Sequence, residues 1–214
     1  MSPYLEEGLV APFLSPTSRR DQESTGLACG RIILTARPLG AAHSHIWCVV
    51  RQPDSSPSYG GYEALYSAAV EPDVFKCAVS VDGVSDLLGN MKFERSFGAD
   101  SARYTYWVKS QGDPTADATR MMSHSPYRLA TGWKTPTLLI HGDKDEIVPI
   151  EESRQMKRAL EGAGKPVRYI EIEGMGHGPS SDDEWTRVLS EIEAFLAVHI
   201  GEPAPASPVA RPTR

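Results

Sequence analysis

The sequence has few cysteines and no long hydrophobic run. Cys29, Cys48 and Cys77 are its only cysteines in 214 residues. Their number is odd and their spacing differs from that of metal ligands, so we expect free, packed thiols. No stretch approaches the roughly 18 apolar residues that a membrane-spanning helix needs. The N-terminus has Glu6 and Glu7 and lacks the basic start and apolar core of a signal peptide, which predicts a cytoplasmic protein without a membrane span.

An excess of positive charge is also missing. The formal net charge is −6, which argues against nucleic acid as a partner because such binding calls for a basic face. With 40% hydrophobic and 23% charged residues, the composition is ordinary for a globular protein. A chain of this length can bury one substantial core, so a single main domain is expected.

Strands and helices alternate from about residue 58 to residue 200. Such alternation predicts an α/β fold with a mostly parallel sheet and helices on both faces. In such a sheet the loops at the carboxyl ends of the strands lie together. We expect strands at Lys76–Val81, Thr135–Ile140 and Val167–Ile172, and helices at Gly61–Val70, Glu151–Leu160 and from the capping box Ser181-Asp182-Asp183-Glu184 to Gly201.

Three parts of the chain depart from this alternation. Residues Leu87–Leu129 are rich in aromatic side chains and predict short helices, which could form a lid or substrate wall or simply pack onto their own domain. Residues 1–57 contain no lysine and have only two strand-like runs, Arg31–Ala36 and His45–Val50. The tail 201–214 is rich in proline and alanine, which predicts disorder.

Three glycine-flanked motifs follow predicted strands or open a predicted helix. They are Ser58-Tyr59-Gly60-Gly61-Tyr62, His141-Gly142-Asp143-Lys144-Asp145 and Gly174-Met175-Gly176-His177-Gly178. Read in order they supply a serine, an acid and a histidine, the order of an α/β-hydrolase triad. In this interpretation Ser58 is the nucleophile, His177 the base and Asp145 the orienting acid, and the backbone N–H of Tyr59 is an oxyanion donor.

Other interpretations of these residues exist. Asp143 is a rival acid, although an aspartate in a loop commonly accepts local hydrogen bonds. His141, Asp143, Asp145 and His177 have the residue types of a metal site, but without the clustered histidine spacing of one, so we expect neither metal nor cofactor. His43 and His45 form a pair that we interpret as surface residues.

Several stretches resemble the catalytic domain of the prolyl oligopeptidase (S9) family of serine peptidases. They are Ser58–Leu65, Pro72–Ser80, Ser125-Pro126, Pro136–Gly142, Asp145 with Val148-Pro149, and Gly176-His177-Gly178. The resemblance runs from about 58 to 199 and implies an α/β-hydrolase fold and hydrolysis of peptide bonds without a cofactor. Its H-G-x-x-D-x-x-V-P pattern places the triad acid on Asp145.

The lead-in to Ser58 departs from that family. The usual first glycine of the nucleophile motif is Ser56, and Pro53 and Pro57 would remove hydrogen-bond donors from a central strand. We therefore divide the chain into an atypical segment 1–57, the catalytic portion 58–200 and the tail 201–214. The abrupt change at Ser58 suggests the hypothesis that 1–57 is not native family sequence, for instance through a shifted reading frame, which would leave the sheet incomplete on its N-terminal side.

The function expected from these features is that of a serine-type peptidase. A small esterase with the same machinery and a truncated, inactive remnant are the alternatives. The expected partner is a peptide or small ester substrate, and an exposed sheet edge could support a homo-oligomer.

Overall fold

The computed structural model describes residues 32–35, 47–50 and 57–200, with side chains from Tyr59 onward. In this part of the chain a five-stranded sheet has the order β1-β2-β3-β4-β5. β1 (Ile32–Thr35) pairs antiparallel with β2 (Trp47–Val50). β2, β3 (Phe75–Val81), β4 (Thr137–Gly142) and β5 (Val167–Ile172) are parallel. The prediction of a mostly parallel sheet is thus confirmed, and the loops after β3, β4 and β5 leave the same end of it.

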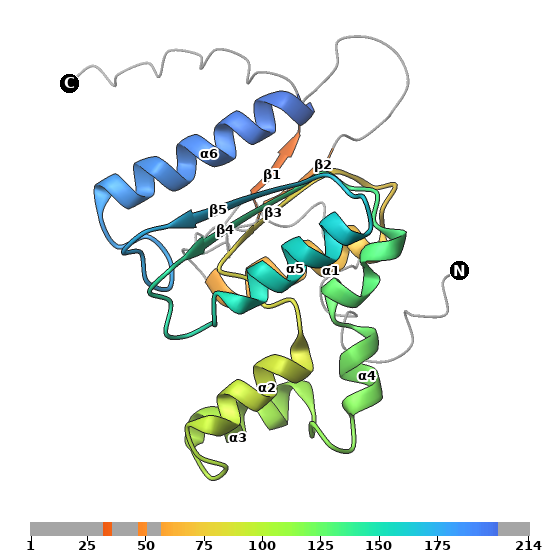
Figure 1. Cartoon of the computed structure of the whole chain (residues 1–214), viewed down its shortest axis with the longest axis vertical. Coiled ribbons are helices and arrows are strands. Elements are labelled where there is room, and N and C mark those ends of the chain that lie inside the picture. The colour runs from red at the N-terminus through yellow and green to blue at the C-terminus, as the bar shows by residue number, and fades with distance from the viewer. Residues whose placement is uncertain (1–31, 36–46, 51–56, 201–214) are drawn as a thin grey trace, which may run out of the picture.

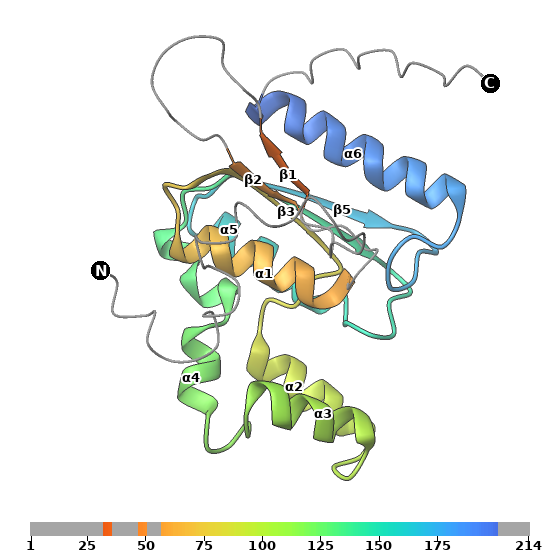
Figure 2. The same cartoon turned by 180° about the vertical axis from the view of Figure 1, so that it is seen from behind.

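Helices cover both faces of this sheet (Figures 1 and 2). α6 (Asp182–Ile200) lies on one face, and α1 (Pro57–Val70) and α5 (Glu151–Gly162) lie on the other. Side chains that alternate along a strand serve the two layers in turn. The α6 layer contains Cys77, Val79, Val81, Leu138, Ile140, Val188, Ile192 and Phe195, and the α1–α5 layer contains Leu65, Ala68, Ala78, Leu139, Met156 and Leu160. Both layers exclude water, so β3 and β4 carry almost no charged residues.

The final helix forms as its sequence predicts. Ser181 Oγ accepts from the Glu184 N–H at 3.3 Å, and Glu184 Oε2 accepts from the Ser181 N–H at 3.1 Å, which is the reciprocal pair of a capping box. Val188, Ile192, Phe195 and Leu196 are buried, whereas Leu189 is 41% exposed. The buried stripe of this helix therefore excludes Leu189.

The aromatic insertion consists of short helices, as predicted. α2 (Leu87–Ser96), α3 (Ala102–Gln111), α4 (Ala118–Ser123) and a 3-10 helix (Pro126–Gly132) follow one another. In Figure 1, α2 and α3 lie below the α1–α5 layer, away from α6. Tyr104 is buried, while Phe97 and Tyr106 are 52% and 63% exposed. The insertion packs into a buried cluster that it shares with Tyr62 of α1 and with Val148, and it also presents aromatic side chains at its surface.

Two expectations need correction. Cys77 is disulfide-bonded rather than a free thiol; the side chains of Cys29 and Cys48 lie outside the described residues. The helix expected from Gly61 begins at Pro57, where a proline's missing N–H has no consequence, because the first N–H groups of a helix lack an internal partner. Pro57 therefore opens a helix, and Ser58 is the second residue of α1.

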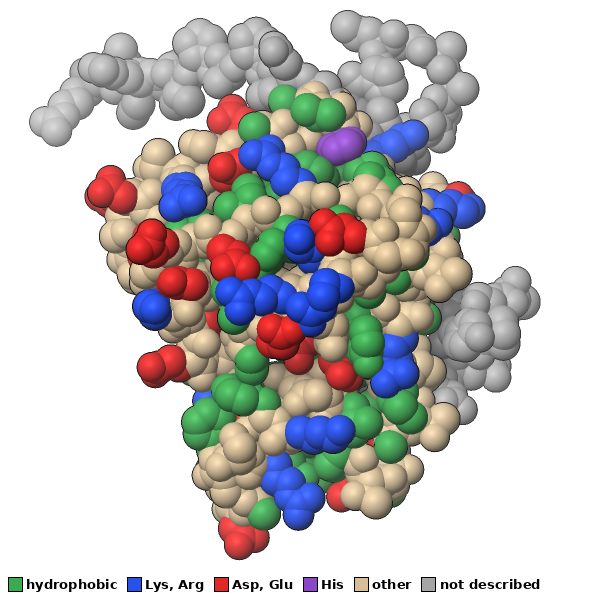
Figure 3. All heavy atoms as spheres, in the orientation of Figure 1, with side chains coloured by type: hydrophobic (Ala, Val, Ile, Leu, Met, Phe, Trp, Pro, Cys, Tyr) green, Lys and Arg blue, Asp and Glu red, His purple; other side chains and the backbone are tan. Residues whose placement is uncertain are grey.

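The two strand-like runs of residues 1–57 join the sheet as β1 and β2, while His43, His45 and the tail 201–214 lie outside the described residues. No helix in the described ranges has both the length and the apolar character needed to cross a membrane. On the face seen in Figure 3, basic and acidic side chains interleave. α5 residues form ion pairs, such as Lys157–Glu161 at 3.3 Å and Arg154–Glu171 at 2.9 Å.

Candidate active site

Asp145 and His177 meet at the end of the sheet where the parallel strands finish. Asp145 follows the last residue of β4 by three positions, and His177 follows the last residue of β5 by five. His177 Nδ1 lies 2.7 Å from Asp145 Oδ2. The aspartate side chain is fully buried, and the imidazole keeps 15% exposure. The acid is thus shielded from water while the histidine reaches the surface.

Local hydrogen bonds fix the Asp145 carboxylate. Its Oδ1 accepts from the backbone N–H groups of Ile147 and Val148 at 2.8 and 2.9 Å. Burial alone would raise the pKa of Asp145, but hydrogen bonds from His141 and His177 and from the Val148 N–H hold it well below its usual range. An ionised Asp145 keeps a proton on His177 Nδ1, so the other ring nitrogen is left as a base.

The two loops that carry Asp145 and His177 are in direct contact. The Lys144 N–H donates to the Met175 carbonyl at 3.0 Å. The second loop passes where a side chain of residue 142 would lie. An ideal Cβ on Gly142 would be 2.3 Å from Met175 O and 2.4 Å from Gly176 O. The glycine after His141 is therefore required by close backbone approach.

Asp82 joins the same two loops and was not found by sequence reasoning. It directly follows β3, is fully buried, and has a φ of +49°, which is unusual for a residue other than glycine. Its Oδ1 accepts from the Gly142 N–H and its Oδ2 from the Gly178 N–H, both at 2.9 Å. An acidic residue at the carboxyl end of a buried parallel strand was the available signal.

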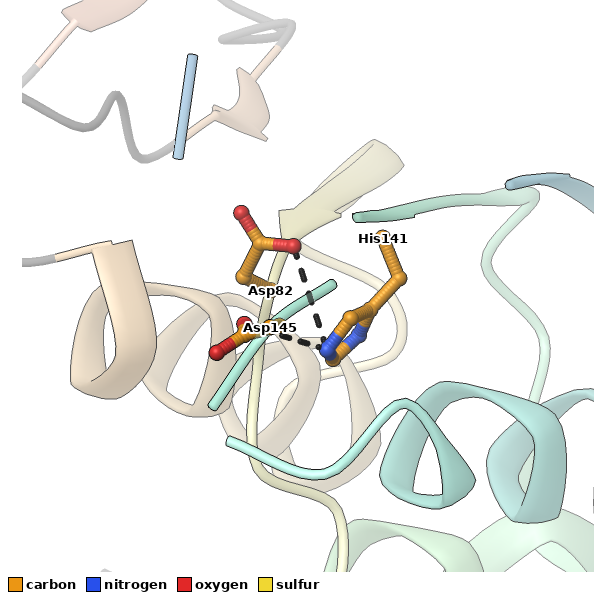
Figure 4. A group of neighbouring side chains, drawn as sticks. All are labelled: Asp82, His141 and Asp145. Carbon is orange, nitrogen blue, oxygen red and sulfur yellow. Dashed lines mark ion pairs between the residues drawn. The ribbon is translucent and has the colours of Figure 1, made fainter. Parts of the chain in front are cut away.

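Asp82, His141 and Asp145 form one buried cluster (Figure 4). Their potential ligand atoms lie within 4.8 Å of one another, so the cluster has the residue types of a cation site. Each carboxylate oxygen, however, already accepts from an N–H group. His141 Nε2 lies near Asp82 Oδ1 and Asp145 Oδ2 as well, so donors already surround the carboxylates, and the expected absence of a metal stays a prediction. Asp143, the rival acid, accepts from the Gly174 N–H at 2.7 Å, which is the loop hydrogen bonding considered for it from the sequence.

The segment that carries Ser58, the predicted nucleophile, opens α1. Ser58 lies in the first turn, where backbone N–H groups such as that of Tyr59 have no partner within the helix and can bind an anion; the Ser58 side chain is outside the described part. The Tyr59 ring stacks on Trp107 of α3 with centroids 5.9 Å apart. A Cβ on Gly61 would lie 2.5 Å from Gly83 Cα, so this glycine allows α1 to pack closely against the loop after β3.

Comparisons with known proteins identify the family of this chain. The model of the prolyl oligopeptidase family matches residues 57–203. Dipeptidyl aminopeptidase BIII of Pseudoxanthomonas mexicana is 31% identical over 146 residues, which are 67% of this chain and 21% of that protein. Dipeptidyl peptidase family member 6 of Caenorhabditis elegans is 30% identical over 154 residues, 67% of this chain and 20% of that protein.

A solved structure gives the same result. A puromycin-hydrolyzing peptidase of Mycobacterium tuberculosis superposes with a TM-score of 0.61 at 29% identity, over 70% of this chain and 22% of that one. The fold is that of an α/β hydrolase, and the chain spans about a fifth of the length of the curated relatives it matches. By the family model and by these relatives, the chain belongs to the prolyl oligopeptidase (S9) family of serine peptidases.

Proposed function

We propose that this chain carries the catalytic portion of a serine peptidase, within residues 58–200, and cleaves peptide bonds through Ser58, His177 and Asp145. The observation that carries the proposal is the 2.7 Å contact between His177 Nδ1 and Asp145 Oδ2, with the second oxygen of the acid bound by two backbone N–H groups. This contact fixes both the orientation and the tautomer of the base.

The proposed reaction uses each residue in turn. His177 takes the proton of the Ser58 hydroxyl as its oxygen attacks the carbonyl carbon of the substrate, and then gives that proton to the leaving amine. The negative charge on the carbonyl oxygen is bound by the Tyr59 N–H at the start of α1. Water then attacks the acyl-enzyme by the same steps, which restores the Ser58 hydroxyl.

Peptides are the proposed substrate class because the family consists of peptidases. Trp107, which stacks on Tyr59, brings α3 next to the nucleophile segment, so the insertion would form one wall beside the acyl site. The cytoplasmic location and self-association through a sheet edge, both expected from the sequence, stay predictions. So does the absence of a cofactor.

Two aspartate variants test the proposal with a matched substitution. We expect Asp145→Asn to slow labelling of the chain by a fluorophosphonate by about a thousandfold or more, because His177 loses its orienting anion. Asp143→Asn, two residues away, keeps an oxygen that can accept from the Gly174 N–H and should label at the rate of the unaltered chain. A loss below tenfold in Asp145→Asn would contradict the assignment.

A second measurement separates the peptidase from its alternatives. The chain should hydrolyse peptide amides as well as p-nitrophenyl esters. Turnover of esters alone would favour the esterase, and a folded chain that neither labels nor turns over would favour the inactive remnant.

A further inference from the structure

His141 is a fully buried histidine that the triad chemistry does not use. It lies near the end of β4, and its side chain has no exposed surface. Nε2 is 3.3 Å from Asp145 Oδ2 and 3.8 Å from Asp82 Oδ1. The oxygen of Asp145 that contacts His177 therefore also faces a second imidazole.

The hydrogen-bond partners of His141 fit a ring that is protonated on both nitrogens. Nε2 lies 3.0 Å from the Val148 carbonyl oxygen and near the two carboxylates, which are all acceptors. Nδ1 lies 2.7 Å from Ser153 Oγ, a hydroxyl that can accept as well as donate. An imidazolium would thus find an acceptor for each of its protons.

Charge balance points the same way. Asp82 and Asp145 bring two buried carboxylates together, which is costly unless a cation lies nearby. Burial alone would lower the pKa of His141, but the hydrogen bond to Asp145 and the charge of Asp82 outweigh it and leave the pKa raised.

The other charged groups around this cluster come from four elements. Glu171 of β5 is the register partner of His141. Arg103 of α3 donates to the Ile147 carbonyl and acts on Asp145 electrostatically. Glu152 of α5 turns its carboxylate to the N–H groups of Ser85 and Asp86. His177 completes the set.

We propose that His141 is a positioning residue of the triad, which as an imidazolium held by Asp82 shares the Asp145 carboxylate with His177. This proposal rests on the proposed function. Its consequence is electrostatic: the positive charge of His141 opposes protonation of His177, and the negative charge of Asp82 favours it. Removing either charge should therefore shift the acidic limb of the labelling profile, in opposite directions.

The experiment measures fluorophosphonate labelling against pH for two variants of the full chain. His141→Gln should move the acidic limb of the profile up by about one pH unit, and Asp82→Asn should move it down by a similar amount, the size expected for one charge a few ångströms away. Ser153→Ala removes a hydrogen bond to the same ring without removing a charged side chain, so its limb should move less than the limb of either charge variant. Structural damage alone would lower the rates without opposite shifts.

Nitrogen-15 NMR of the imidazole rings gives a readout that does not need activity. We expect both nitrogens of His141 to stay protonated above the pH at which an ordinary histidine titrates, and Asp82→Asn to lower its pKa. In His141→Gln the Nδ1 proton of His177 should move downfield, because Asp145 then serves one histidine. A neutral His141 at pH 6, or limb shifts in the same direction for both variants, overturns the proposal. A chain that does not label contradicts the proposed function, and the NMR titration then decides the proposal on His141.

Discussion

Gly142→Ala is the substitution whose effect on the site follows most directly from the structure. The new Cβ would lie 2.3 Å from Met175 O, 2.4 Å from Gly176 O and 2.7 Å from Met175 C. All three atoms are backbone, so no rotamer change can relieve the contact. The loop before His177 must move by about an ångström to restore ordinary van der Waals distances.

That movement has two measurable consequences. Overpacking of this kind costs about 1–3 kcal/mol of unfolding free energy. A displacement of a catalytic group by about an ångström can slow a reaction roughly a hundredfold. We therefore expect Gly142→Ala to remain folded, to unfold at lower urea concentration, and to label with a fluorophosphonate about a hundred times more slowly than the unaltered chain.

Gly162→Ala is the matched control. Gly162 is the last residue of α5, and a Cβ there meets no atom within 4 Å. The same substitution at this position should leave labelling unchanged and add up to about 1 kcal/mol of stability through helix propensity. Wild-type stability and a wild-type labelling rate in Gly142→Ala would refute the close approach of the two loops.

Two further predictions concern stability. Burial raises the pKa of Glu152 to about 7, against hydrogen bonds from Ser85 and Asp86 that favour ionisation, so the folded chain holds this proton more tightly than the unfolded chain. The resulting stability is present below about pH 4.5 and is lost as the pH rises to about 7, which amounts to about 3 kcal/mol. Glu152→Gln should lack this loss. Urea unfolding of the unaltered chain and of Glu152→Gln at pH 4.5 and pH 8 measures it. If the two chains differ in unfolding free energy by the same amount at both pH values, the prediction is wrong. Trp133 is fully buried, and its Nε1 donates to Thr135 O and Thr137 Oγ1 at 2.7 and 2.9 Å, so Trp133→Phe should cost about 2–4 kcal/mol in the same assay, and a change below about 0.5 kcal/mol would count against those bonds.

Features with a local cause could be predicted from the sequence. β5 has the predicted bounds, Val167–Ile172, because its alternating β-branched and polar residues are bounded by proline and glycine. The Ser181–Glu184 capping box forms because both of its partners lie within one helical turn. Asp145 and His177 meet because each follows a parallel strand of the same sheet.

Features that depend on contacts between distant segments could not be predicted from the sequence. β4 runs on to Gly142 because His141 and Gly142 pair with Glu171 and Ile172 of β5, although neither residue type favours a strand. The position of Asp82 after a buried strand was a weak signal, because its partners Gly142 and Gly178 are 60 and 96 residues away in the chain. The start of α1 was set four residues too late because Pro57 was interpreted as a strand breaker, whereas it is the first residue of a helix.

The most direct test of the central claim is the site of covalent labelling. The full chain would be treated with a fluorophosphonate, digested, and sequenced by mass spectrometry, with Ser58→Ala alongside and the fold of both checked by circular dichroism. The account predicts one modified peptide, with the label on Ser58, and no labelling of Ser58→Ala. Labelling that persists in folded Ser58→Ala, or a folded unaltered chain that takes up no label, would contradict it.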